Sequence, residues 1–216
     1  MDAIIVAAGC DLTDPREAQE LLGQSDLVIC ADGGLNFLEK LNILPDVVLG
    51  DFDSAENLSF LYEGEKLKEG VLLQSFPVRK DQTDLELALD YALDKGIDRC
   101  IILGGTGSRL DHSLCNIFLL ERYQRLGLSA QMVNETNRIS YWTEGEYRLP
   151  KTKPGWYQSF LAMPEDVHLS LEGFDYDLDD QLLARGSSLA ISNHVIRDDA
   201  RVIVRGKGVY TIRSTD

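Results

Sequence analysis

Short apolar runs alternate with longer amphipathic segments through the first 135 residues. The runs are continuous and rich in small and β-branched side chains, as expected of parallel strands that are covered on both faces. They occupy residues 3–8, 27–31, 46–49, 71–76, 101–103 and 129–133. Strands of this kind that alternate with helices predict a parallel sheet with helices on both faces.

Three helix starts in this part of the chain carry capping signals. Asp14 is followed by a proline and, two residues later, by an acid, which is typical of a first helical turn. Thr83 and Glu86 have the spacing of a capping box, and so do Ser108 and Asp111. We therefore expect helices after Asp14 and Thr83 and over residues 35–41 and 109–125.

The pattern changes after about residue 137, where helical signals fade. Short alternating runs now stand between turns rich in Gly, Pro and Asp, which predicts a small antiparallel sandwich or barrel. The runs cover residues 139–142, 157–163, 168–171, 188–192, 201–204 and 208–212. The expected fold class is therefore α/β, with a parallel-sheet domain in residues 1–135 and a smaller all-β domain in residues 136–216.

Composition and charge narrow the functional classes. The net charge of −15 argues against a nucleic-acid partner, because such binding needs clustered Lys and Arg. We expect no membrane span and no signal peptide, and hence a cytoplasmic protein. The four cysteines and three histidines have no metal-binding spacing, so the cysteines are expected to be buried free thiols.

The loop after the run at 101–103 has the composition of an anion site. Gly104, Gly105 and Gly107 allow a tight turn with exposed amides, and Arg109 adds a forked cation at the start of the next helix. The loop lacks the Gly-Lys-Ser/Thr ending of a P-loop, and Leu110 stands at the position of the third dinucleotide-fingerprint glycine. A glycine turn between a strand and a helix can also be purely structural.

Acidic side chains follow the predicted strands. The carboxyl ends of parallel strands meet at one edge of a sheet, so these acids are expected to lie near the glycine loop. An Asp-x-Asp pair such as Asp51 and Asp53 suits Mg²⁺, which can relieve the repulsion between the two carboxylates. Single acids at such positions are commonly helix caps or turn formers. The acids concerned are Asp32, Asp51, Asp53, Asp81, Asp84 and Asp111.

Taken together, five motifs give the chain a resemblance to the thiamine pyrophosphokinase family. Their order and spacing are similar to those of the family over essentially the whole chain, including the change from α/β to all-β. The motifs are Asp32-Gly33-Gly34, Gly50-Asp51-Phe52-Asp53-Ser54, Asp81-Gln82-Thr83-Asp84, the run from Gly104 to His112, and Ser192-Asn193.

The resemblance implies transfer of a pyrophosphoryl group from ATP to the hydroxyl of thiamine, giving thiamine diphosphate and AMP. It implies Asp51, Asp53 and Asp84 as magnesium ligands, with Asp81 as a further catalytic carboxylate and no assigned general base. The implied ATP-binding residues are Asp32, Gly33, Gly34, Lys80, Gly104, Gly105, Gly107, Ser108, Arg109, Asp111, His112 and Asn116.

The resemblance also implies that the second domain contributes to the thiamine site across a homodimer. Ser192 and Asn193 match the family's serine and asparagine pair, although Ile191 replaces the preceding threonine. Ser188 is a secondary candidate. The thiazolium ring is a flat cation, so an aromatic platform is expected, and Tyr210 is the first choice ahead of the two tryptophans.

Two other functions fit the acidic and glycine motifs. A metal-dependent glycosyltransferase would use Asp51 and Asp53 to hold a sugar nucleotide, and would release a nucleotide only with a sugar acceptor. A nucleotide-sensing module that is not an enzyme would bind ATP without turnover. The nucleotide product formed with ATP, magnesium and thiamine distinguishes the three hypotheses.

Overall fold

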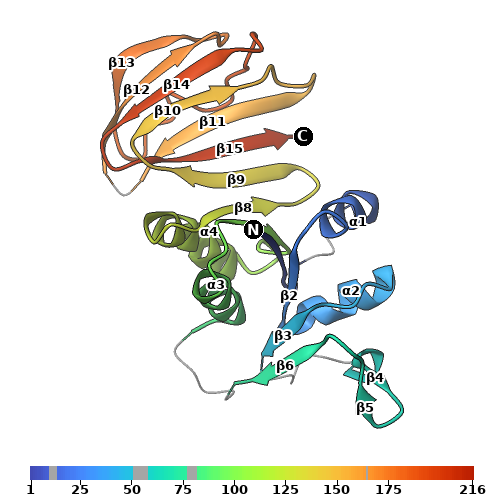
Figure 1. Ribbon diagram of the computed structural model, residues 1–216. Helices are drawn as coiled ribbons and strands as arrows, with labels where there is room; N and C mark the ends of the chain where they lie inside the picture. The colour runs from blue at the N-terminus through green and yellow to red at the C-terminus, as the bar shows by residue number, and fades with distance from the viewer. Residues whose placement is uncertain (10–13, 51–57, 77–81, 164) are drawn as a thin grey trace. The chain divides into compact units, whose positions relative to one another are not determined.

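The computed structural model of the protein describes residues 1–9, 14–50, 58–76, 82–163 and 165–216. The chain forms two compact units, Met1–Glu135 and Thr136–Asp216, which are described separately below (Figure 1). Within the described ranges, no helix has both the length and the apolar character that crossing a membrane requires.

The N-terminal unit is built on a parallel sheet with the strand order β8-β7-β1-β2-β3-β6. Its strands are β1 (Asp2–Val6), β2 (Leu27–Ala31), β3 (Val47–Gly50), β6 (Leu72–Ser75), β7 (Arg99–Leu103) and β8 (Ser129–Val133). Its helices are α1 (Pro15–Leu22), α2 (Leu35–Leu41), α3 (Asp84–Asp94) and α4 (Leu110–Arg125). A short hairpin of β4 (Tyr62–Glu63) and β5 (Lys66–Leu67) precedes β6. The predicted parallel α/β sheet is thus confirmed.

The strand order reverses direction between β1 and β7. From β1 the chain adds β2, β3 and β6 on one side, and then returns to place β7 and β8 on the other side. In open parallel sheets, ligands bind beyond the carboxyl ends of the strands at such a reversal, because the two following loops diverge there. The glycine loop after β7 therefore starts at the position where a ligand is expected.

Helices cover both faces of this sheet (Figure 1). One face packs the apolar sides of α1 and α2 against strand residues such as Ile4 and Cys30, which are at most 1% exposed. The other face carries α3, which contacts the neighbouring strands β1, β2 and β3 and whose buried residues include Leu85 and Leu89. Each fully buried leucine or isoleucine contributes about 1.5–3 kcal/mol to this core.

Two of the three predicted helix caps are confirmed. The Asp14 side chain accepts a hydrogen bond from the Arg16 amide at 2.9 Å, at the start of α1. The Thr83 hydroxyl accepts one from the Glu86 amide at 3.2 Å, at the start of α3. These side chains satisfy amides that have no partner within the helix, which fixes where each helix begins.

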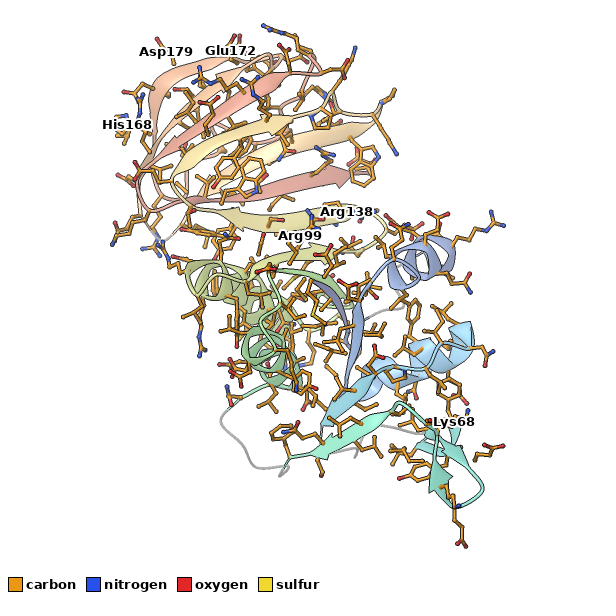
Figure 2. The ribbon with its side chains drawn as sticks, in the orientation of Figure 1. Lys68, Arg99, Arg138, His168, Glu172 and Asp179 are labelled. Carbon is orange, nitrogen blue, oxygen red and sulfur yellow. The ribbon has the colours of Figure 1, made fainter. Side chains whose placement is uncertain are left out.

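The C-terminal unit contains two antiparallel sheets, with the strand orders β11-β15-β9 and β10-β14-β12-β13. Phe160 and Val209 from the first sheet share a buried core with Leu169 and Val202 from the second, so the unit is a sandwich, as expected. The outer face of the second sheet is charged and includes His168 (Figure 2). The strands are β9 (Asn137–Trp142), β10 (Gly145–Leu149), β11 (Trp156–Ala162), β12 (Val167–Glu172), β13 (Leu178–Leu183), β14 (Ala200–Arg205) and β15 (Val209–Thr215).

The prediction of a strand over residues 188–192 is wrong, because these residues form a turn. The Ile191 amide donates to the Ser188 carbonyl at 3.2 Å, which closes a turn. Ser192 has a φ of 57°, in the left-handed region, which is uncommon for a residue other than glycine and is outside the range of regular strands. The alternation of small and apolar residues here reflects a turn in which Ala190 packs into the sandwich core.

The cysteines lead to a prediction about chemical labelling. Cys30 and Cys100 are buried, as expected, and burial raises the pKa of the Cys100 thiol to about 12. Cys115 is exposed on α4, which corrects the expectation for that residue, and Cys10 lies outside the described residues. Because the thiolate is the reactive form, iodoacetamide at pH 7.5 should label Cys115 and leave Cys30 and Cys100 unmodified until the protein is denatured. Peptide mass mapping measures this, and equal labelling of Cys100 and Cys115 in the native protein would contradict it.

Candidate functional site

The glycine loop between β7 and α4 lies directly against the segment that follows β1. The Gly9 amide donates to the Gly104 carbonyl at 3.1 Å. A Cβ atom at Gly9 would lie 2.1 Å from the Thr106 carbonyl oxygen, so only glycine allows this approach. Gly104 itself has a φ of 77°. The loop is therefore seated by backbone contacts at the reversal point of the sheet.

The Asp32-Gly33-Gly34 motif follows β2, which pairs with β1 on the side opposite β7, and it approaches the end of β1. It forms a short 3-10 turn between β2 and α2. A Cβ atom at Gly34 would lie 2.1 Å from the carbonyl oxygen of Val6, the last residue of β1. A Cβ atom at Gly33 would lie 3.1 Å from the Ala8 side chain. Two of the predicted motifs thus converge on the carboxyl end of β1.

Asp84 is the first residue of α3 and is partly buried. Its position is fixed by Thr83, which caps the helix, and by Gln82, whose amide donates to the Asp90 carboxylate at 2.7 Å. The Tyr123 hydroxyl from α4 donates to the other oxygen of Asp90 at 2.6 Å. The Asp81-Gln82-Thr83-Asp84 motif is therefore tied to α3 through Asp90, and the same carboxylate ties α3 to α4.

Four of the predicted site residues, Asp51, Asp53, Lys80 and Asp81, lie outside the described residues. The strands that lead to them, β3 and β6, run parallel to β2 and end at the same edge of the sheet. Among the described residues, no group of three or more His, Cys, Asp or Glu side chains is placed to hold a metal ion. The magnesium site therefore remains a prediction.

The capping box expected at Ser108 and Asp111 is wrong. Helix α4 begins at Leu110, so Arg109 occupies the N-cap position, and among the described residues no side chain caps the helix there. Asp111 is thus the second helical residue, and its carboxylate pairs with the Arg109 guanidinium at 2.7 Å. The Arg109 guanidinium donates two charge-assisted hydrogen bonds to the Asp111 carboxylate.

The pair formed by Arg109 and Asp111 stays ionised at neutral pH. The Arg109 guanidinium lowers the pKa of the Asp111 carboxyl, and the carboxylate raises the pKa of Arg109. Their side chains are 68% and 67% exposed, so the pair is open to solvent. An exposed pair of this kind contributes little to stability, and Arg109 can exchange Asp111 for a ligand phosphate. His112 is exposed in the same helical turn.

Three polar side chains, from α4 and from the residue after β8, form hydrogen bonds with the glycine loop. The Asn116 amide donates to the Gly105 carbonyl at 2.8 Å, and the Asn134 amide donates to the Thr106 hydroxyl at 2.9 Å. The Ser113 hydroxyl accepts from the Gly107 amide at 3.1 Å. Sequence reasoning named Asn116 but missed the other two. Asn134 carried one usable signal, since it directly follows the strand β8 at the same sheet edge.

The predicted thiamine-binding residues belong to the C-terminal unit. Asn193 is 3% exposed, and its side chain donates to the Tyr176 carbonyl at 2.8 Å and accepts from the Tyr176 amide at 3.2 Å. Ser192, the residue before Asn193, is exposed, and so is Ser188. The Tyr210 ring is 1% exposed and packs edge-on against Tyr141, with a centroid distance of 4.9 Å. Asn193 therefore shapes the turn that presents Ser192.

The two tryptophans that were secondary aromatic candidates are also engaged within this unit. Trp142 stacks on Tyr147, with a centroid distance of 4.2 Å. The Arg138 guanidinium lies over the Trp156 ring, 5.6 Å from its centroid. Each contact occupies one face of an indole ring.

Comparison with known proteins covers both units. The catalytic domain of thiamin pyrophosphokinase matches residues 18–132, and its vitamin B1 binding domain matches residues 146–209. The thiamine pyrophosphokinase of Bacillus subtilis strain 168 is 36% identical over 202 residues, which cover 91% of this chain and 92% of the relative.

Solved structures agree with this similarity. A crystal structure of thiamine pyrophosphokinase from Bacillus subtilis superposes with a TM-score of 0.87 at 33% identity, covering 100% of this chain and 99% of the other. One from Geobacillus thermodenitrificans gives 0.86 at 29% identity, covering 100% and 98%. Sequence and fold both match along nearly the full length, and the chain therefore belongs to the thiamin pyrophosphokinase family.

Proposed function

We propose that the protein transfers the pyrophosphoryl group of ATP to the hydroxyl of thiamine, forming thiamine diphosphate and AMP. The observation that carries this proposal is the meeting of the glycine loop, with Arg109 at its end, and the Asp32-Gly33-Gly34 turn at the carboxyl end of β1. Amides at a helix start and an exposed guanidinium are groups that bind phosphate. The family membership supports thiamine as the acceptor.

The reaction needs alignment and charge neutralisation more than covalent help from the protein. The thiamine hydroxyl oxygen bonds to the β-phosphorus of ATP, and the bond from that phosphorus to the oxygen bridging to the α-phosphorus breaks. AMP leaves with the bridging oxygen, and the hydroxyl proton is released. Arg109 would stabilise the charge on the phosphoryl oxygens, for which it must release Asp111.

The proposed magnesium site is formed by aspartate side chains, whose carboxylates are suitable ligands for this ion. Asp51, Asp53 and Asp84 would supply hard oxygen ligands, which Mg²⁺ prefers, and Mg²⁺ bound there would neutralise polyphosphate charge. Asp84 supports this role by its place at the start of α3, with a side chain that is only partly buried. Asp32 and Asp81 would complete the acidic lining.

Thiamine binding would involve the second unit, with Ser192 as the exposed hydroxyl at a turn shaped by Asn193. We propose that two chains form a homodimer, in which the second unit of one chain completes the site of the other. Sedimentation equilibrium tests the dimer: a species of twice the mass of one chain is expected, and a monomer at assay concentrations would contradict this arrangement.

The test of the function is the identity of the nucleotide product. Incubation with ATP, MgCl₂ and thiamine should form AMP and thiamine diphosphate in equal amounts, and omission of thiamine should abolish AMP formation. Formation of ADP would indicate transfer of a single phosphoryl group. Binding of ATP with no thiamine-dependent product would favour the nucleotide-sensing alternative. Release of a nucleotide from a sugar nucleotide only when a sugar acceptor is present would favour the glycosyltransferase.

A further inference from the structure

Ser113 is a buried serine on α4 that the proposed chemistry does not use. It is 8% exposed, and its hydroxyl oxygen accepts the Gly107 amide proton at 3.1 Å. Its own proton can be donated to the Arg109 carbonyl at 3.0 Å or to the Gly107 carbonyl at 3.3 Å. One side chain thus holds the glycine loop and the first turn of α4 together.

Gly107 differs from the other glycines of this region. Gly104 needs its positive φ, Gly9 is required by the close approach of two backbone segments, and a Cβ atom at Gly105 would press on Met132 and Ile102 at 3.0–3.2 Å. At Gly107, a Cβ atom would meet no atom of the described residues within 4 Å, and φ is outside the left-handed region. The fold of the described residues therefore gives no reason for glycine at this position.

The Gly107 amide also faces the protein rather than a ligand. Because it donates to Ser113, it is not available to a phosphate oxygen in this conformation. Gly107 would therefore help nucleotide binding by leaving room for the ligand, because it has no side chain. The exposed glycine amide expected from the sequence would not contact the phosphate at this position. The position of that space depends on the Ser113 hydroxyl, since no other group among the described residues is hydrogen-bonded to Gly107.

We propose that Ser113 is a positioning residue of the nucleotide site, which holds Gly107 so that the loop leaves room for the phosphates of ATP beside Arg109. This inference rests on the proposed function. Loss of the hydroxyl frees the Gly107 amide and carbonyl, so the loop samples conformations in which the space is closed. The ligand must then select the open conformation, which weakens its apparent affinity.

The experiment compares four variants of the full chain: Ser113→Ala, Ser113→Thr, Gly107→Ala and Ser25→Ala. Ser25 is a matched control, because its hydroxyl also donates to a backbone carbonyl, that of Leu22 at 2.9 Å, at the end of α1. For each variant we would measure ATP affinity by calorimetry, KM for ATP and for thiamine, kcat, and the thermal midpoint.

Ser113→Ala should weaken ATP binding and raise KM for ATP about tenfold, with kcat and KM for thiamine within about twofold of the parent. Ser113→Thr, which keeps a hydroxyl, should bind ATP much as the parent does. Gly107→Ala should keep or slightly raise the thermal midpoint while weakening ATP binding at least tenfold, because the methyl group takes the ligand's space. Ser25→Ala should lower the midpoint only.

The proposal is overturned if Ser113→Ala lowers the thermal midpoint as Ser25→Ala does but binds ATP normally. It is also overturned if Gly107→Ala binds ATP normally, or if Ser113→Thr is as impaired as Ser113→Ala. These outcomes are separable from failure of the proposed function. If the parent protein forms no thiamine diphosphate, the function fails, while the calorimetric comparison of ATP binding still tests Ser113.

Discussion

Asp84→Asn is expected to reduce kcat for thiamine diphosphate formation by about 10²- to 10³-fold, the range found when one strong electrostatic contact to a transition state is removed. Asparagine has nearly the same shape but no charge, so it would hold magnesium and the attached phosphates poorly. The fold should persist, because the Thr83 cap remains and Asp84 is only partly buried. Loss of an acid from the first turn of α3 should cost about 0.3–1 kcal/mol of stability.

Asp94→Asn is the matched control for this prediction. Asp94 is the last residue of the same helix and is exposed, so the same chemical change is made at the opposite end of α3. Its turnover should equal that of the parent, and its stability should be equal or slightly higher, since a carboxylate is unfavourable at a helix C-terminus. The measurement is the initial rate of AMP formation, together with the midpoint of urea unfolding. A near-normal rate for Asp84→Asn would show that the carboxylate is not needed in the reaction.

The elements that could be predicted from sequence are those determined by local signals. The buried strands of the N-terminal unit are continuous apolar runs, and the runs at 27–31 and 129–133 match β2 and β8 to the residue. The starts of α1 and α3 follow from capping side chains that act on amides two or three residues away. Signals of this range are visible in the sequence because both partners lie in one short window.

The sequence pattern could not show contacts between distant segments. Gly9 looks only like the end of a strand, and its steric role depends on Thr106, which reaches it because β7 pairs with β1. Ser113 looks like any helical serine until the glycine loop folds back onto α4. Strand β13 was missed because its sequence, LDDQLL, is mostly exposed and lacks the apolar alternation of a strand with one buried face.

The failed cap at Ser108 has a different cause. Ser108 and Asp111 do have capping spacing, but Arg109 stands between them and pairs with Asp111. The capping-box rule considers only the backbone amides and omits this charged partner. The spacing therefore predicted correctly that a helix starts here, but the prediction that Ser108 caps this helix was wrong. The residue at the N-cap position is instead Arg109, the arginine that is proposed to bind phosphate.

Gly34→Ala is expected to destabilise the fold severely, by about 3 kcal/mol or more, out of the 5–15 kcal/mol typical of a domain. The new Cβ atom would lie 2.1 Å from the carbonyl oxygen and 2.6 Å from the carbonyl carbon of Val6, and 3.2 Å from the Ala7 amide nitrogen. These are backbone atoms at the end of β1, which is held on both sides by β2 and β7. They cannot retreat without breaking the centre of the sheet.

Gly34 was also predicted to bind ATP, so loss of activity in Gly34→Ala would not by itself distinguish a folding defect from a binding defect. Comparing the urea unfolding of Gly34→Ala with that of Gly107→Ala separates the two defects. Among the described residues, a new methyl group would have open space at Gly107 but would clash with backbone atoms at Gly34. The unfolding midpoint should fall sharply for Gly34→Ala and stay near that of the parent for Gly107→Ala. If Gly34→Ala kept the parent's midpoint and lost only ATP affinity, the turn between β2 and α2 would act through the ligand, and the close approach to Val6 would not be what requires glycine there.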